Sequence, residues 1–170
     1  MRELPWLPRL YLSRFWQLAE QAIGEPVAAA KDERYGAVIN VQRGTRMRFE
    51  CHVDSNPLTG LLFCSDHAFG AGGELIFAHD QRAASRAGIE RSRCVIRLQS
   101  GHLIFFDGWY HSHYAGPLTP GSDTRIVAVM NYNTRSCPES TRPKELIRHL
   151  FDEQYRACDV GVGRRLRPVP

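Results

Sequence analysis

Lysine is almost absent from this sequence of 170 residues, in which Lys31 and Lys144 are the only two examples. The formal net charge of +4 therefore comes from arginines, which are scattered along the chain and form no basic stripe. Proteins that bind nucleic acid usually cluster Lys and Arg on one face, so nucleic acid is a possible but not a favoured partner. A mild positive charge would instead help a small anion to approach.

Paired cysteines and long apolar runs are also missing. The five cysteines are odd in number and show no C-x-x-C spacing, which argues against a disulfide framework and against a zinc site made of thiolates. The first residues, MRELPWLPRLYLSRFW, are interrupted by charges and two prolines, unlike a signal peptide. No apolar run approaches the roughly 20 residues that span a bilayer. We therefore expect a cytoplasmic protein that does not enter a membrane.

Length and composition predict a single domain over residues 1–170, because 43% of the residues are apolar and 24% are charged. Two segments have apolar residues at the three-to-four spacing of a helix. One covers residues 9–23 and is followed by Gly24, which favours a helix end. The other covers about 143–158. We expect one N-terminal and one C-terminal helix.

The residues between these helices form short segments rich in β-branched and aromatic side chains, separated by Gly, Pro, Asn and Ser. This pattern is typical of a β-sandwich or barrel. The polar segment 80–92 is expected to be a loop or a short helical insert. The eight expected strands are 35–42, 46–53, 59–65, 73–79, 93–98, 102–107, 111–115 and 124–132.

The segment CHVDSNPLTGLLFC places His52 and Asp54 two residues apart in front of an apolar run. In a strand, residues i and i+2 point to the same face, so an imidazole and a carboxylate would project side by side. An H-x-D triplet alone has little meaning, because it occurs by chance in many sequences.

A second cluster, FFDGWYHSHYAGPLTPGSDTRIVAV, makes a metal-binding role for the H-x-D triplet much stronger. It adds a further histidine, and either His111 or His113 could serve, since both have the same strand parity. Two imidazoles and one carboxylate with the other positions open form the facial triad that binds non-haem Fe(II). Arg125, on the last expected strand, could pair with a carboxylate of a bound cosubstrate.

The order of these motifs resembles the Fe(II)/2-oxoglutarate-dependent dioxygenases, and most of all the branch with prolyl 4-hydroxylase-type domains. The resemblance covers about residues 35–132. It includes H-x-D, then Gly72-Gly73-Glu74-Leu75, then a histidine four residues before a proline, as His113 is before Pro117, and then a late Arg125. It implies a double-stranded β-helix, or jelly-roll, and favours His113 over His111 as the second histidine.

The resemblance also implies the cofactors and the residues that bind them. Fe(II) would be held by His52, Asp54 and His113, and Arg125 would bind the distal carboxylate of 2-oxoglutarate, with O2 as the oxidant. Relatives that demethylate alkylated bases have an asparagine before H-x-D that contacts 2-oxoglutarate, and Asn40 would correspond to it.

The sequence departs from the family pattern two residues after the arginine. The family usually has a serine there that also binds the distal carboxylate, whereas this chain has Val127. Asn131 shares the strand parity of Arg125 and could replace the serine, while Tyr132 faces the other way. Asn56, His111 and Trp109 are expected to contact the substrate.

The function that follows from the resemblance is hydroxylation of an unactivated C–H bond in a small molecule, such as an amino acid or a biosynthetic intermediate, with release of succinate and CO2. One alternative is a hydroxylase or demethylase of a nucleobase or a protein residue, and another is a jelly-roll binding module without turnover. A cupin-type enzyme without 2-oxoglutarate is a further alternative, but it would use more histidines and no late arginine.

Overall fold

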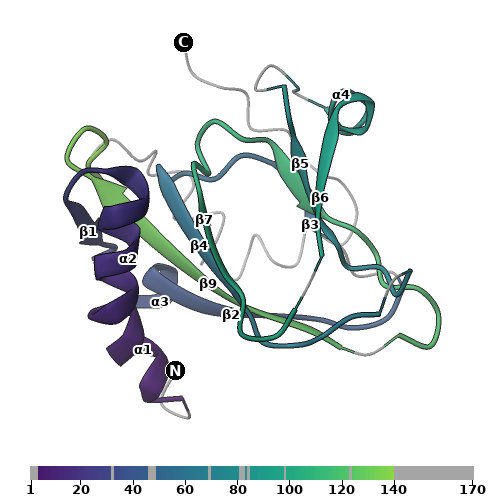
Figure 1. Ribbon diagram of the computed structural model, residues 1–170, viewed down its shortest axis with the longest axis horizontal. Coiled ribbons are helices and arrows are strands. Elements are labelled where there is room, and N and C mark those ends of the chain that lie inside the picture. The colour runs from purple at the N-terminus through teal and green to yellow at the C-terminus, as the bar shows by residue number, and fades with distance from the viewer. Residues whose placement is uncertain are drawn as a thin grey trace, which may run out of the picture.

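The molecule consists of two facing antiparallel sheets, with the N-terminal helices on the outer side of the larger sheet and one short helix beside the smaller sheet (Figure 1). The computed structural model describes residues 4–31, 33–45, 49–68, 70–80, 83, 85–97, 99–122 and 124–139. The two facing antiparallel sheets confirm the double-stranded β-helix predicted from the sequence. The C-terminal helix expected near 143–158 lies outside the described residues.

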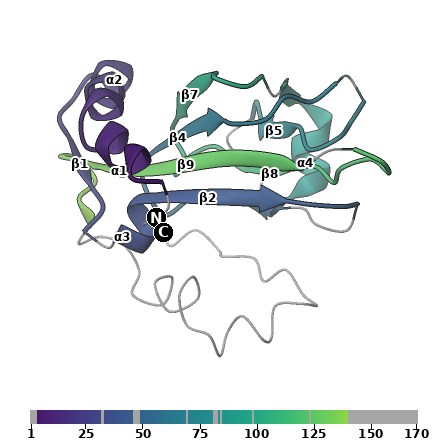
Figure 2. The same ribbon diagram turned by 90° about the horizontal axis from the view of Figure 1, so that it is seen from below.

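Each sheet brings together strands that are distant in the sequence. The larger sheet has the order β1 (Val27–Ala29), β9 (Arg125–Thr134), β4 (Leu58–Phe63) and β7 (Leu103–Phe106), and β2 (Ala37–Gln42) also pairs with β9. The smaller sheet has the order β3 (Phe49–His52), β8 (His113–Ala115), β5 (Leu75–Ala78) and β6 (Arg93–Ile96). The long central strand β9 crosses the whole larger sheet in Figure 2.

All eight predicted strands are present, but the sequence did not predict β1. The segment EPVAAAK has no alternating pattern, and β1 forms because β9 extends far enough to pair with it, with Val27 opposite Thr134. The segment predicted as a strand from residue 35 begins with a helical turn, α3 (Glu33–Gly36). The polar insert contains the short helix α4 (Arg86–Arg91).

The single N-terminal helix expected over 9–23 is two helices, α1 (Trp6–Tyr11) and α2 (Arg14–Ile23). They separate at Ser13, whose backbone is not helical and whose hydroxyl donates to the carbonyl of Arg9 at 2.5 Å. A serine that bonds to the preceding turn competes with continuation of the helix. None of the helices in the described part of the chain is long and apolar enough to span a bilayer.

Alternate residues of β9 belong to two different cores. Ala128, Met130 and Tyr132 face α1 and α2 and pack with Leu7 and Tyr11. Val127 lies on the inner side, between the sheets, in a core that also holds Leu61, Phe63, Leu75 and Phe77. Arg125 has the parity of Val127, so its side chain starts on the inner side.

Candidate functional site

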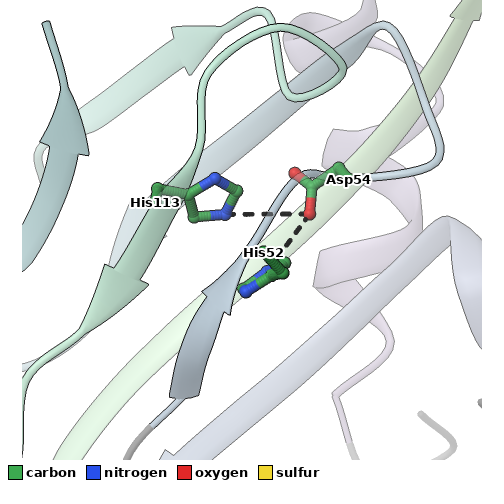
Figure 3. Close-up of side chains that lie close together, drawn as sticks. All are labelled: His52, Asp54 and His113. Carbon is green, nitrogen blue, oxygen red and sulfur yellow. Dashed lines mark ion pairs between the residues drawn. The ribbon is translucent and has the colours of Figure 1, made fainter. Parts of the chain in front are cut away.

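His52, Asp54 and His113 come together at one end of the smaller sheet (Figure 3). His52 ends β3 and His113 begins β8, and these two residues are directly opposite each other in the paired strands. Asp54 follows just beyond β3. Its Oδ1 lies 3.4 Å from His52 Nε2 and 3.7 Å from His113 Nε2. All three ligand atoms lie within 4.8 Å of one another, the only such group found among the described residues.

The orientation of the His113 ring is fixed by its surroundings. Nδ1 lies 2.9 Å from the carbonyl oxygen of His111, which can only accept a hydrogen bond, so Nδ1 carries the proton. The lone pair of Nε2 then faces Asp54. Rings of Phe77 and Phe106 lie 5.5 and 5.0 Å away between centroids. Burial lowers the pKa of His113, which favours the neutral imidazole that a metal requires.

The carboxylate of Asp54 has two different sides. Oδ1 faces the histidines, whereas Oδ2 accepts a hydrogen bond of 2.5 Å from the hydroxyl of Thr59. The backbone N–H of Asp54 donates to the carbonyl of Gly108 at 2.7 Å. Burial raises the pKa of Asp54, but His113, His52 and the bond from Thr59 outweigh this effect, so the pKa lies below its usual value and the group is charged.

Gly108 permits this arrangement because it has no side chain. A Cβ at this position would lie 2.5 Å from Asp54 Oδ2 and 2.6 Å from Thr59 Oγ1. Such distances are far shorter than a van der Waals contact, so any other residue would displace the carboxylate.

Arg125 is a buried cation without a partner in the described part of the chain. It is 3% exposed, and its Nε has no hydrogen-bond partner there. Burial lowers the pKa of Arg125 to about 10, so the guanidinium is still charged at neutral pH. Gly73 leaves room for it, since a Cβ at Gly73 would lie 3.1 Å from Arg125 Cδ. Because buried charges are normally paired, the position suits an anion from outside the chain.

The arginine and the triad border the same inner core. Phe77 packs in the core that contains Val127, two residues from Arg125, and its ring also contacts His113. Asn40 lies directly opposite Val127 on β2 and is half-buried, so it starts on the side of Arg125. The contact of Asn40 with a bound anion stays a prediction.

Asn131 is on the expected side of β9 but does not contribute to the anion site around Arg125. It follows Arg125 by six residues, which at about 3.3 Å per residue places it about 20 Å along the strand. Its Nδ2 donates instead to the backbone carbonyl of Tyr35 at 2.7 Å. Parity gives the face of a residue, but it does not give the distance.

The three expected substrate contacts have different positions. Asn56 is 0% exposed and bonds with Tyr35, Leu58 and Thr59, so protein encloses the side chain that was expected to meet the substrate. The backbone carbonyl of His111 orients the ring of His113, and the side chain of His111 is half-buried. Trp109 is 40% exposed and lies next to Gly108, so it remains the best placed of the three.

Sequence reasoning missed Thr59, Gly108 and Tyr35. A glycine next to aromatic residues, as in FFDGWY, can indicate close approach of another group and could have drawn attention to Gly108. Nothing in the sequence distinguishes Thr59 from an ordinary strand threonine.

No protein-family model and no curated protein matches the sequence. Similar solved structures include the non-haem alpha-ketoglutarate-dependent epimerase SnoN from nogalamycin biosynthesis, with a TM-score of 0.58, 19% identity and coverage of 75% of this chain and 55% of that chain. HygX from Streptomyces hygroscopicus, with nickel, 2-oxoglutarate and hygromycin B bound, has a TM-score of 0.57, 13% identity and coverage of 77% and 66%. A prolyl 4-hydroxylase from Phytophthora capsici has a TM-score of 0.55, 15% identity and coverage of 92% and 53%.

These likenesses are structural, since fewer than one residue in five is identical in each. The chain spans between about half and two thirds of the length of these three proteins. The set contains a prolyl 4-hydroxylase, an epimerase that depends on alpha-ketoglutarate (2-oxoglutarate) and a protein with 2-oxoglutarate bound, so the resemblance indicated by the sequence motifs is confirmed at the level of the fold. The chain has the jelly-roll fold of the non-haem 2-oxoglutarate-dependent oxygenases.

Proposed function

We propose that this chain is an Fe(II)- and 2-oxoglutarate-dependent oxygenase whose single domain covers residues 1–170, with the core at about 35–132. One observation carries the proposal: a His-Asp-His cluster and a buried arginine that has no partner among the described residues border the same inner core. The cluster accounts for a metal and the arginine for an anionic cosubstrate. A jelly-roll that only binds a neutral ligand requires neither.

The donor set fits Fe(II). His52 Nε2, His113 Nε2 and Asp54 Oδ1 would hold the ion, and two imidazoles with one carboxylate on one side are typical of non-haem Fe(II) sites. A structural zinc site would normally have four protein ligands. The side chain of His52 is 42% exposed, so the cluster is open on that side to other ligands.

The arginine fits 2-oxoglutarate, a dicarboxylate. Its 2-oxo acid end can chelate the metal, and its distal carboxylate can pair with the planar fork of Arg125. Asn40, on the same side of the sheet, would add a contact. Fe(II) with 2-oxoglutarate and O2 supplies the oxidising power when bound, and the chain's own residues bind, orient and shield these groups. HygX, which has a similar fold, binds nickel and 2-oxoglutarate in its structure.

We further propose that the reaction is hydroxylation of an unactivated C–H bond in a small molecule, with release of succinate and CO2. The structure of HygX with hygromycin B shows that a protein of this fold binds a small organic molecule. In this chain, Trp109 and His111 are the proposed substrate contacts, because both lie in the turn that reaches from Gly108 to His113. We expect the protein to act in the cytoplasm.

The test measures succinate formation from 2-oxoglutarate with Fe(II) and O2, across a panel of amino acids and biosynthetic intermediates. The parent should form succinate, and His113→Ala and Arg125→Met should not. Methylated oligonucleotides and peptides form separate arms, and turnover confined to those arms would replace the small-molecule assignment. No succinate in any arm from a folded, iron-loaded parent would instead support a binding module without turnover.

A further inference from the structure

We propose that a buried hydrogen-bond relay, Tyr35 to Asn56 to Thr59, holds Asp54 so that it offers only Oδ1 to the metal. The inference rests on the proposed function, because the relay has this role only if Asp54 binds a metal. It assigns a role to three residues beyond the metal ligands. Thr59 contacts the carboxylate but not the metal position, so it is a positioning residue.

The direction of each hydrogen bond in the relay follows from its chemistry. Asn56 Nδ2 lies 2.7 Å from the carbonyl of Leu58, which can only accept, so the amide nitrogen faces that way. The same Nδ2 then donates to Thr59 Oγ1 at 2.9 Å, and Asn56 Oδ1 accepts from the hydroxyl of Tyr35 at 2.7 Å. Because Thr59 accepts from Asn56, its single proton is directed to Asp54 Oδ2.

The relay extends beyond the amide at its far end. The Tyr35 hydroxyl has one proton, which it gives to Asn56, so in its contact of 2.7 Å with Ser55 Oγ it is the acceptor. The backbone carbonyl of Tyr35 accepts from Asn131. The tyrosine is thereby tied to β9 in the centre of the larger sheet.

The relay is shielded from water. Asn56 is 0% exposed, Thr59 2% and Tyr35 8%. Hydrogen bonds in such surroundings are stronger than at the surface, and a lost member cannot easily be replaced by solvent. A buried chain in which each bond orients the next specifies one position for the last acceptor, Asp54 Oδ2.

The relay affects how many coordination positions of the metal stay open to other ligands. Oδ2 is held by Thr59 and packs against Gly108, whereas Oδ1 faces both histidines. A carboxylate that binds through one oxygen occupies one coordination position, and a carboxylate that turns to bind through both occupies two. The relay therefore keeps a position available for the chelating cosubstrate and O2.

The experiment titrates the metal-free protein with Co(II) and records the visible spectrum, which responds to the coordination number. Thr59→Val removes the hydroxyl while keeping the shape, and it should weaken Co(II) binding about 10- to 100-fold, as is typical when a partner of a metal ligand is lost. The spectrum should change as well. Thr59→Ser, which keeps the hydroxyl, should restore both. Tyr35→Phe should shift the affinity in the same direction by a smaller factor.

Thr119→Val is the matched control, because Thr119 is exposed and its hydroxyl contacts only Ser122 among the described residues. It should leave affinity and spectrum unchanged. Parent affinity and spectrum in folded Thr59→Val would overturn the relay. If Thr59→Val does not fold, Tyr35→Phe decides, and an unchanged affinity and spectrum in it overturns the relay. Failure of the parent to bind Co(II) more tightly than His113→Ala would instead count against the proposed function itself.

Discussion

Replacement of Arg125 by methionine should stabilise the protein while abolishing its response to 2-oxoglutarate. Burial lowers the pKa of Arg125 well below its ordinary value, to about 10. At 1.36 kcal/mol per pKa unit, that difference corresponds to a cost of roughly 3 kcal/mol for keeping the charge buried. Methionine has a similar length and no charge. We expect Arg125→Met to recover part of this cost, on the order of 1 to 3 kcal/mol.

The sign of the pH dependence follows from the lowered pKa. Below about pH 10 the arginine is charged in both the folded and the unfolded protein, so the cost is fully present. Above that pH the folded protein releases the proton before the unfolded chain does, and the cost declines. The advantage of Arg125→Met should therefore be constant from pH 6 to 9 and shrink at higher pH.

The assay is thermal unfolding with and without Mn(II) and 2-oxoglutarate under anaerobic conditions. Without ligands, Arg125→Met should melt several degrees above the parent, at about 2 to 4 °C per kcal/mol for a chain of this size. At a concentration 100 times its Kd, 2-oxoglutarate should add about 2.7 kcal/mol to the stability of the parent beyond the contribution of Mn(II), whereas the variant should gain only the contribution of Mn(II). Arg125→Lys keeps the charge and should show no gain in the absence of ligands.

A less stable Arg125→Met would refute this reasoning, because it would mean that the guanidinium has a stabilising partner within the protein. Equal stabilisation of parent and variant by 2-oxoglutarate would refute the second part. It would show that the cosubstrate binds without Arg125.

Four further substitutions test the site. His113→Ala should abolish binding of Mn(II). His111→Ala should change the Kd of Mn(II) less than about threefold, because His111 acts through its backbone carbonyl. Equal losses of Mn(II) affinity in titrations of the two variants would contradict this assignment. Gly108→Ala should weaken Mn(II) binding at least tenfold, since the new methyl group overlaps Asp54 Oδ2, and unchanged binding would show that the loop moves without consequence. Trp109→Ala should raise the KM for the organic substrate and leave the Kd of 2-oxoglutarate unchanged, as measured by steady-state kinetics and a binding titration. An unchanged KM with a raised Kd of 2-oxoglutarate would mean that the ring contacts the cosubstrate instead.

The fold was predictable because its strands are short, alternating and separated by turn residues. The departures arise where neighbours decide the conformation. The strand β1 depends on the length of β9, with which it pairs, and the segment EPVAAAK alone does not indicate it. The break between α1 and α2 depends on one hydroxyl of Ser13, which the helical spacing of the apolar residues conceals.

The triad was accessible from sequence because two local features, H-x-D and the late histidine, meet across one pair of strands. The residues that support it were not accessible. The relay depends on the path of the loop between Asp54 and Thr59, which the triplet does not specify, and this path turns Asn56 inward. Parity placed Asn131 on the same face of β9 as Arg125, but this rule could not show that Asn131 is far from Arg125.

On the proposed function, the His-Asp-His cluster and Arg125 bind Fe(II) and 2-oxoglutarate together. This joint binding is tested most directly by anaerobic titration of the protein with both, following the weak visible metal-to-ligand charge-transfer band of chelated 2-oxoglutarate. We expect a band in the parent, no band in His113→Ala, and a band in Arg125→Ala only at far higher 2-oxoglutarate concentration. A folded parent that binds iron and shows no band would contradict it.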